Sequence, residues 1–200
     1  MKKVGIMGGT FNPIHNGHLF LAEHAYEQAG LDYVLFMPTM NPPHKADMTI
    51  IPAEHRINMV REAVKDNPHF IISDFELNRP GITYTSDTLK ALKENEPDTE
   101  YYFIVGGDSL MMMAHWMDPK TVFGLSTIIA GGREQCSQEQ LEEQVKYLEN
   151  EFGGRIILLD MPLIELSSEK VRERVAKGKS IIYYVPDEVA RYIREHNLYI

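Results

Sequence analysis

The segment KVGIMGGTFNPIHNGHLFLAEHAYEQA, residues 3–29, contains the pattern that decides the fold. It opens with Lys3 and the apolar run Val4–Met7, and residues 3–7 are predicted to form a β-strand. Residues 17–29 follow with apolar side chains at the spacing of one helix face, and they predict an amphipathic helix. A strand joined directly to a helix is the first part of a βαβ unit, from which parallel sheets are built.

The same alternation continues along the rest of the chain. Further strands are expected at residues 33–37, 70–75, 101–105, 127–130 and 155–159. Further helices are expected at residues 53–65, 86–94, 110–114, 119–125, 138–151, 168–177 and 186–195. This order predicts an α/β fold, a Rossmann-like doubly wound parallel sheet with helices on both faces and a C-terminal helical segment. No linker interrupts the pattern, so residues 1–200 are expected to form a single domain.

Composition excludes several classes of partner and site. The chain has 29 acidic and 20 basic residues and a net charge of −9, so binding to nucleic acid or to an anionic membrane is not expected. The single Cys136 excludes an intrachain disulfide framework and a multi-thiolate zinc site. No signal peptide or membrane-spanning stretch is found, and we expect a cytoplasmic enzyme.

The first loop after the first strand predicts a phosphate site. Gly8 and Gly9 are expected to form a turn whose N–H groups approach an anion, and the helix that begins near Gly17 adds its positive end. The dinucleotide fingerprint GxGxxG does not match, because Thr10 and Pro13 occupy its later glycine positions. No GK[ST] follows, so the loop is not a P-loop either.

Two histidines at the start of the first helix point to the same chemistry. His15 and His18 can turn toward one space and donate hydrogen bonds to phosphate oxygens. The alternative is a pair of surface histidines without a role. A zinc site would need further ligands, and none lies at a convincing spacing.

Residues 8–18 resemble the GTFxPxHxGH signature of nucleotidyltransferases that carry an HxGH motif on a Rossmann-like sheet. The order of the later motifs is similar to that of the bacterial nicotinate mononucleotide adenylyltransferases along nearly the whole chain. The matching residues are Pro42, Pro43, His44, Lys45, His55, Arg56, Tyr84, Thr85, Asp87, Thr88, Gly106, Asp108, Trp116, Ser167, Ser168, Val171 and Arg172.

The resemblance implies adenylyl transfer from ATP to nicotinate mononucleotide, with Mg2+ accompanying ATP and no metal site made by the protein itself. It implies catalytic roles for His15, His18 and Arg172 in holding the triphosphate. Further ATP contacts are implied for Gly8, Gly9, Thr10, Phe11, Gly106, Asp108, Ser167 and Ser168. Contacts to the mononucleotide are implied for Asn12, Lys45, Tyr84, Thr85, Trp116 and Arg133.

Two positions depart from the family pattern, and some alternatives stay open. Glu169 stands where the family's serine motif usually continues with threonine, and His115 stands where a basic residue often precedes the tryptophan. One alternative is another adenylyl- or cytidylyltransferase with a phosphopantetheine or sugar-alcohol phosphate acceptor. A non-catalytic nucleotide-binding module is a second. The sequence also leaves the oligomeric state open, a homodimer included.

Overall fold

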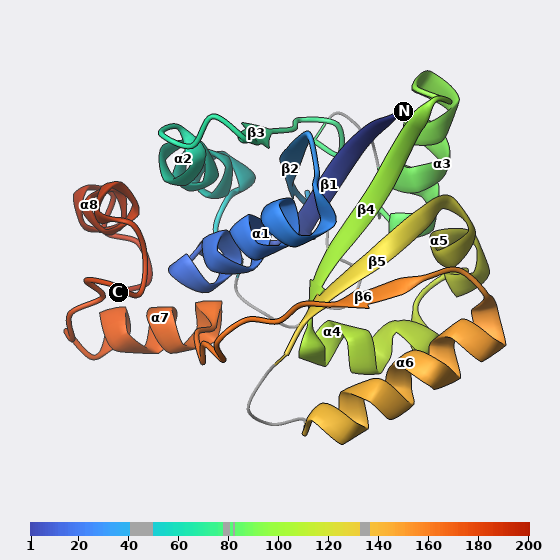
Figure 1. The fold of residues 1–200 in the computed structure, drawn as a ribbon. Coiled ribbons are helices and arrows are strands. Elements are labelled where there is room, and N and C mark those ends of the chain that lie inside the picture. The colour runs from blue at the N-terminus through green and yellow to red at the C-terminus, as the bar shows by residue number, and fades with distance from the viewer. Residues whose placement is uncertain (41–49, 78–80, 82, 133–136) are drawn as a thin grey trace.

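The computed structural model describes residues 1–40, 50–77, 81, 83–132 and 137–200. Its centre is a parallel sheet in the order β3-β2-β1-β4-β5-β6 (Figure 1). The strands are β1 Lys2–Gly9, β2 Tyr33–Pro38, β3 Phe70–Ile72, β4 Thr99–Gly106, β5 Ser126–Gly131 and β6 Ile156–Leu158. The predicted α/β fold with a doubly wound parallel sheet is therefore confirmed.

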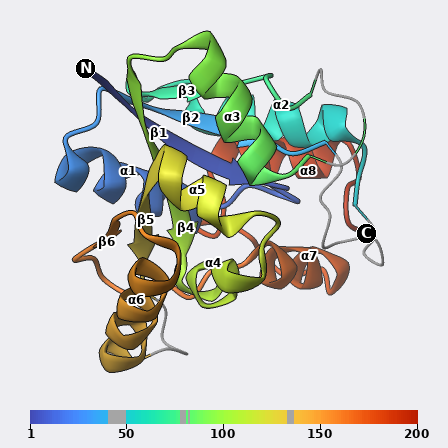
Figure 2. The same ribbon diagram turned by 90° about the vertical axis from the view of Figure 1, so that its right-hand side faces the viewer.

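Helices cover both faces of this sheet. They are α1 Asn16–Ala29, α2 Ala53–Val64, α3 Thr85–Asn95, α4 Gly107–Met112, α5 Pro119–Leu125, α6 Gln138–Phe152, α7 Ser168–Ala176 and α8 Asp187–Glu195, with a short 3-10 helix η1 at Met113–His115. Figure 2 shows α3, α4 and α5 over one face, while α1, α2 and α8 lie on the other. The predicted C-terminal helical segment corresponds to α7 and α8.

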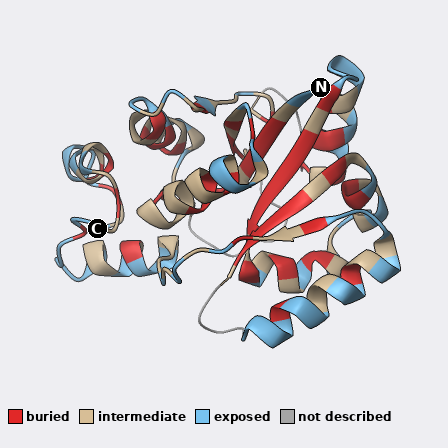
Figure 3. Cartoon of the chain, in the orientation of Figure 1, coloured by how far each residue is buried: buried red, intermediate tan, exposed pale blue. Residues whose placement is uncertain are grey.

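Two buried apolar clusters fill the layers between sheet and helices (Figure 3). One contains side chains of α1, α2, α7 and α8, and the other contains side chains of α3, α4, α5 and α6. Strand β4 supplies both, with Tyr102 and Ile104 on the first side and Tyr101, Phe103 and Val105 on the second. Side chains alternate across a strand, which is why a strand covered on both faces is apolar throughout.

Five element boundaries differ from the prediction by more than one residue. Strand β4 begins two residues early, at Thr99, and helix α4 ends two residues early, at Met112. Strand β1 runs two residues further, to Gly9, because it stays paired with β2 to its end. Strand β3 ends at Ile72 rather than at residue 75, and the chain then turns, with the Leu77 N–H donating to the Asp74 carbonyl at 2.9 Å. Helix α4 begins at Gly107, directly after β4, instead of at residue 110.

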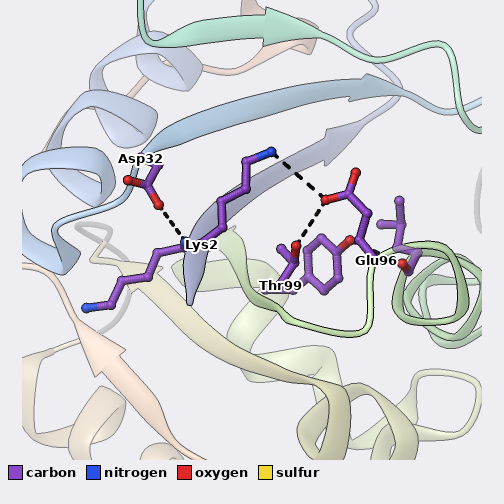
Figure 4. A network of polar contacts seen from close by, with 7 residues as sticks. Lys2, Asp32, Glu96 and Thr99 are labelled. Carbon is purple, nitrogen blue, oxygen red and sulfur yellow. Dashed lines mark hydrogen bonds and ion pairs between the residues drawn. The ribbon is translucent and has the colours of Figure 1, made fainter.

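The amino edge of the sheet is held by polar contacts far from the strand-to-helix loops (Figure 4). The Lys3 N–H donates to the Asp32 carboxylate at 2.7 Å, which ties β1 to the start of β2. Glu96 accepts from the Thr99 hydroxyl at 3.0 Å, and the Lys2 ammonium lies 4.0 Å from the same carboxylate. These contacts fix the amino ends of β1 and β4 and leave the carboxyl edge open to ligands. Within the described ranges no helix has both the length and the apolar character to cross a membrane.

Candidate active site

The candidate site lies where β1 and β4 separate at the carboxyl edge of the sheet. Their pairing begins at Lys2 with Thr99 and ends at Ile6 with Phe103. Beyond this point β1 stays paired only with β2, and β4 only with β5. The strand order reverses between β1 and β4, and such a switch point is where open parallel sheets bind ligands. The loop after β1 therefore borders the expected crevice.

The two glycines before this loop belong to β1, so the predicted Gly-Gly turn is wrong. Gly8 and Gly9 pair with Met37 and Pro38 of β2. A Cβ on Gly9 would lie 3.3 Å from the ring of Phe11, which is closer than nine in ten real Cβ contacts. The absence of a side chain at Gly9 thus makes room for an aromatic ring behind the loop.

Residues 10–15, which we call the first loop, are buried throughout. Phe11 adopts a left-handed backbone conformation with φ 48°, and only 2% of its side chain is exposed. Its ring packs against Phe36, with ring centroids 6.1 Å apart, and lies edge-on to His18 at 5.1 Å. The Phe11 side chain is therefore part of the core.

His15 and His18 are brought together as the sequence predicted. Their rings stack at 3.7 Å between centroids, at the N-terminus of α1. The His15 N–H donates to Nδ1 of His18 at 3.2 Å. Because Nδ1 accepts, the proton of a neutral His18 lies on Nε2, which makes Nε2 a hydrogen-bond donor. A Cβ on Gly17 would lie 3.0 Å from Nδ1 of His15, so a side chain at this position would force the His15 ring to shift.

Side chains from the C-terminal part of the chain hold the first loop. The Ser168 hydroxyl donates to the Pro13 carbonyl at 2.8 Å, and Nη1 of Arg172 donates to the Asn12 carbonyl at 2.8 Å. The Tyr199 hydroxyl donates to Oδ1 of Asn12 at 3.0 Å. Helix α7 and the chain end thereby fix a loop that is more than 150 residues away in sequence.

Helix α7 begins with the serine motif, and its two serines have different contacts. Oγ of Ser167 accepts from the Lys170 N–H at 3.1 Å, which caps the helix. Ser168 instead contacts the first loop. Glu169, which departs from the family pattern, is exposed in the first turn, where a carboxylate interacts favourably with the helix dipole.

The end of β4 carries a second group of predicted residues. Gly106 precedes α4 in an extended conformation, and Asp108 is exposed in the first turn of that helix. Trp116 follows η1, and its ring meets that of Phe103 edge-on, with centroids 5.9 Å apart. A Cβ on Gly8 would lie 3.4 Å from the Phe103 ring. Phe103 therefore connects Trp116 to the end of β1.

Tyr84 and Thr85 stand at the start of α3, where Tyr84 is the N-cap residue. One turn further, the Thr88 hydroxyl donates at 2.8 Å to the buried carboxylate of Glu76. This contact fixes the start of α3 against the preceding segment. Lys45 and Arg133 were also predicted to bind the mononucleotide, and both lie outside the residues that the structure describes.

Two residues next to the first loop were not assigned a role from the sequence. Arg56 is 1% exposed and donates to the Thr10 carbonyl at 2.7 Å, and burial lowers the pKa of its guanidinium. Burial raises the pKa of Tyr199, against the opposing effect of the nearby charges of Arg172 and Arg56. Two signals were available for Arg56: it belongs to a matching motif with His55, and it lies on the apolar face of α2, three and four residues before Met59 and Val60.

The amino-acid sequence matches a known family and several full-length relatives. The model of the cytidylyltransferase-like family matches residues 6–174. A protein of Lachnoclostridium phytofermentans named "Probable nicotinate-nucleotide adenylyltransferase" is 46% identical over 200 residues, which is 100% of both chains. A protein of Dehalococcoides mccartyi with the same name is 45% identical and covers 98% of this chain and 97% of its own.

A solved structure shares the fold. The Plasmodium falciparum nicotinic acid mononucleotide adenylyltransferase complexed with NaAD superimposes with a TM-score of 0.83 at 21% identity, over 100% of this chain and 98% of its own. The family match and the full-length relatives lead to one assignment. This chain belongs to the cytidylyltransferase-like family and, within it, to the group of the nicotinate-nucleotide adenylyltransferases.

Proposed function

We propose that this chain transfers the adenylyl group of ATP to nicotinate mononucleotide and releases pyrophosphate, forming nicotinate adenine dinucleotide for NAD biosynthesis. The observation that carries the chemistry is the buried first loop, which presents the stacked pair His15 and His18 and is anchored by Ser168 and Arg172. The full-length relatives support nicotinate mononucleotide as the acceptor. The two buried clusters share one sheet, which supports a single nucleotidyltransferase domain over residues 1–200.

The reaction brings two anions together. An oxygen of the 5′-phosphate of the mononucleotide forms a bond to the α-phosphorus of ATP, while the bond from that phosphorus to the bridging oxygen breaks and pyrophosphate leaves. Two unit charges 4 Å apart repel by about 4 kcal/mol at an effective dielectric constant of about 20. Holding the reactants in line contributes roughly 7–11 kcal/mol to lowering the barrier. Positioning and charge stabilisation therefore suffice, without a protein nucleophile.

The histidine pair is proposed to hold the triphosphate. Nε2–H of His18 donates to a phosphate oxygen, because Nδ1 is already an acceptor for the His15 N–H. His15, which is 5% exposed and stacked on His18, restricts that ring to one orientation and contributes to the same phosphate site. Donors that are fixed before the reaction stabilise the charge that develops on the bridging oxygen.

The remaining ATP contacts are proposed around the first loop and the end of β4. Arg172 uses one N–H for the Asn12 carbonyl, and its other N–H groups are proposed to bind the β- and γ-phosphates. The other proposed ATP contacts are Gly8, Gly9, Thr10, the main chain of Phe11, Gly106, Asp108, Ser167 and Ser168.

The mononucleotide is proposed to bind beside β4 and α3. Trp116 would stack its ring on the pyridine, supported behind by the edge-on Phe103. Tyr84 and Thr85 at the start of α3 would offer main-chain N–H groups to the nicotinate carboxylate, which accepts hydrogen bonds only. Asn12, Lys45 and Arg133 are the other proposed contacts.

Mg2+ is proposed to arrive with ATP. Within the described part of the chain, no three Asp, Glu, His or Cys side chains come close enough to hold a metal ion together. Mg2+ is often bound mainly by phosphate oxygens and water, with one or two protein carboxylates. The carboxylate of Asp108, which is exposed, is proposed as the protein contact of such an ion. When bound, Mg2+ neutralises charge on the phosphates.

Pyrophosphate release tests the proposed acceptor. We expect release from ATP with nicotinate mononucleotide, and a smaller kcat/KM with nicotinamide mononucleotide, whose amide would place donors against donors. Phosphopantetheine and the exchange of ATP for CTP should give background rates. Turnover with phosphopantetheine or with CTP, and none with either pyridine nucleotide, would contradict the proposal.

Replacing His18 tests the phosphate role of the pair. His18→Ala removes one positioned donor, so kcat should fall by at least about 10²-fold while the circular dichroism spectrum stays that of the wild type. His24→Ala, later in the same helix, is the matched control and should keep wild-type turnover. A near-normal rate for His18→Ala would remove the phosphate-binding role.

Replacing Trp116 tests the mononucleotide subsite. Trp116→Ala should raise the KM for nicotinate mononucleotide about 10-fold and leave the KM for ATP within about 2-fold, because only the pyridine loses a stacking partner. Met117→Ala, at the adjacent residue with 55% exposure, should change neither constant. Equal effects on both KM values would show that Trp116 does not stack on the pyridine.

A further inference from the structure

The buried Arg56 side chain donates hydrogen bonds to four main-chain carbonyl groups. Nη1 donates to the Thr10 carbonyl at 2.7 Å and to the Thr39 carbonyl at 2.8 Å. Nη2 donates to the Met40 carbonyl at 3.3 Å, and Nε to the Ile51 carbonyl at 3.4 Å. One guanidinium group thus joins the first loop, the chain leaving β2 and the chain entering α2.

The charge of Arg56 has no counter-ion in the described part of the chain, where none of the ion pairs includes it. A buried guanidinium stays protonated in proteins, and its transfer from water is costly even when every N–H is bonded. An apolar residue on this face of α2 would pack against Met59 and Val60 without that cost. The retained charge therefore suggests a role beyond stability.

The contacts lie where the two neighbouring strands end. Pairing of β1 with β2 stops at Gly9 and Pro38, and the Thr39 N–H still donates to the Gly9 carbonyl at 2.9 Å. Arg56 extends this attachment to the next residue of each segment, Thr10 and Thr39. Without it, the attachment between the two segments would lose its hydrogen bonds at Thr10 and Thr39.

Arg56 also affects the polarity of the first loop. Its donor, together with those of Arg172 and Ser168, engages the carbonyls of Thr10, Asn12 and Pro13. A carbonyl oxygen that accepts from such a donor has part of its negative charge offset, so it repels a nearby anion less. The positive charge of Arg56 then acts in the same direction through a region of low dielectric constant.

We propose that Arg56 is a positioning residue for the transfer reaction: its guanidinium fixes the first loop against the chain leaving β2 and thereby sets the relative position of the two bound substrates. This inference rests on the proposed function, in which the first loop contacts ATP through Thr10 and Phe11 and the mononucleotide through Asn12. A lysine cannot replace it, because one ammonium group lacks the planar set of donors that reaches several carbonyls at once.

The test is Arg56→Lys, measured beside Arg61→Lys as the control. Arg61 lies on the same helix, is exposed, and donates to Asn58 at 2.7 Å. The dissociation constant of ATP is measured by calorimetry without acceptor, and KM is measured for both substrates. We expect Arg56→Lys to raise the ATP dissociation constant and both KM values about 10-fold or more, and Arg61→Lys to leave all three unchanged.

The alternative outcome is equally specific. A purely structural role would lower the folded fraction, and hence kcat per total protein, while both KM values and the ATP dissociation constant of the folded protein stay at wild-type values. That result, or a change confined to one substrate, overturns the proposal. If Arg56→Lys does not fold, the ATP dissociation constant and both KM values are measured for Arg56→Gln instead. Failure of both variants to fold would assign Arg56 to stability alone.

The two proposals can fail separately. If the wild type releases no pyrophosphate with nicotinate mononucleotide, the proposed acceptor is wrong. The calorimetric comparison of Arg56→Lys with Arg61→Lys still decides the effect of Arg56 on the first loop, because ATP binding requires no turnover. An unchanged ATP dissociation constant in that comparison would overturn the role of Arg56 while leaving the proposed reaction intact.

Discussion

The hydrogen bonds to the carbonyl groups of the first loop are the constraint on which the rest of the site depends. Main-chain carbonyl oxygens repel a bound phosphate unless hydrogen-bond donors offset their partial negative charge. Here Arg56 of α2, Arg172 and Ser168 of α7 take up three of these carbonyls. The arrangement requires α2, α7 and α8 to lie on the same face of the sheet as α1. Side chains of these four helices pack together in the first apolar cluster, which holds the helices on that face.

The net charge of −9 is compatible with a phosphate site because the charges are unevenly distributed. Arg56 and Arg172 lie against the first loop, whereas Glu139, Glu142 and Glu143 are exposed on α6 over the other face. A small pocket needs only a few fixed donors, since local fields depend on nearby groups more than on net charge. A long polyanion would need an extended basic surface, and the chain has only 20 basic residues against 29 acidic ones.

The sequence predicted the sheet and the proximity of His15 and His18 because both depend on local patterns: apolar runs, helical periodicity and the spacing of the two histidines. It failed where tertiary contacts decide. Gly9 looked like a turn residue and is a strand residue that accommodates the Phe11 ring. The contacts of Arg56 and Tyr199 join segments 46 and 187 residues apart, and no local pattern encodes them.

In the proposed reaction the protein positions two substrates and forms no covalent intermediate with either. The stereochemistry of the transfer tests that claim directly. With a single diastereomer of adenosine 5′-O-(1-thiotriphosphate) as the donor, one in-line attack by the mononucleotide inverts the configuration at the α-phosphorus. We therefore expect a dinucleotide with inverted configuration. Retention would require two successive displacements through an adenylylated side chain, and it would contradict the account.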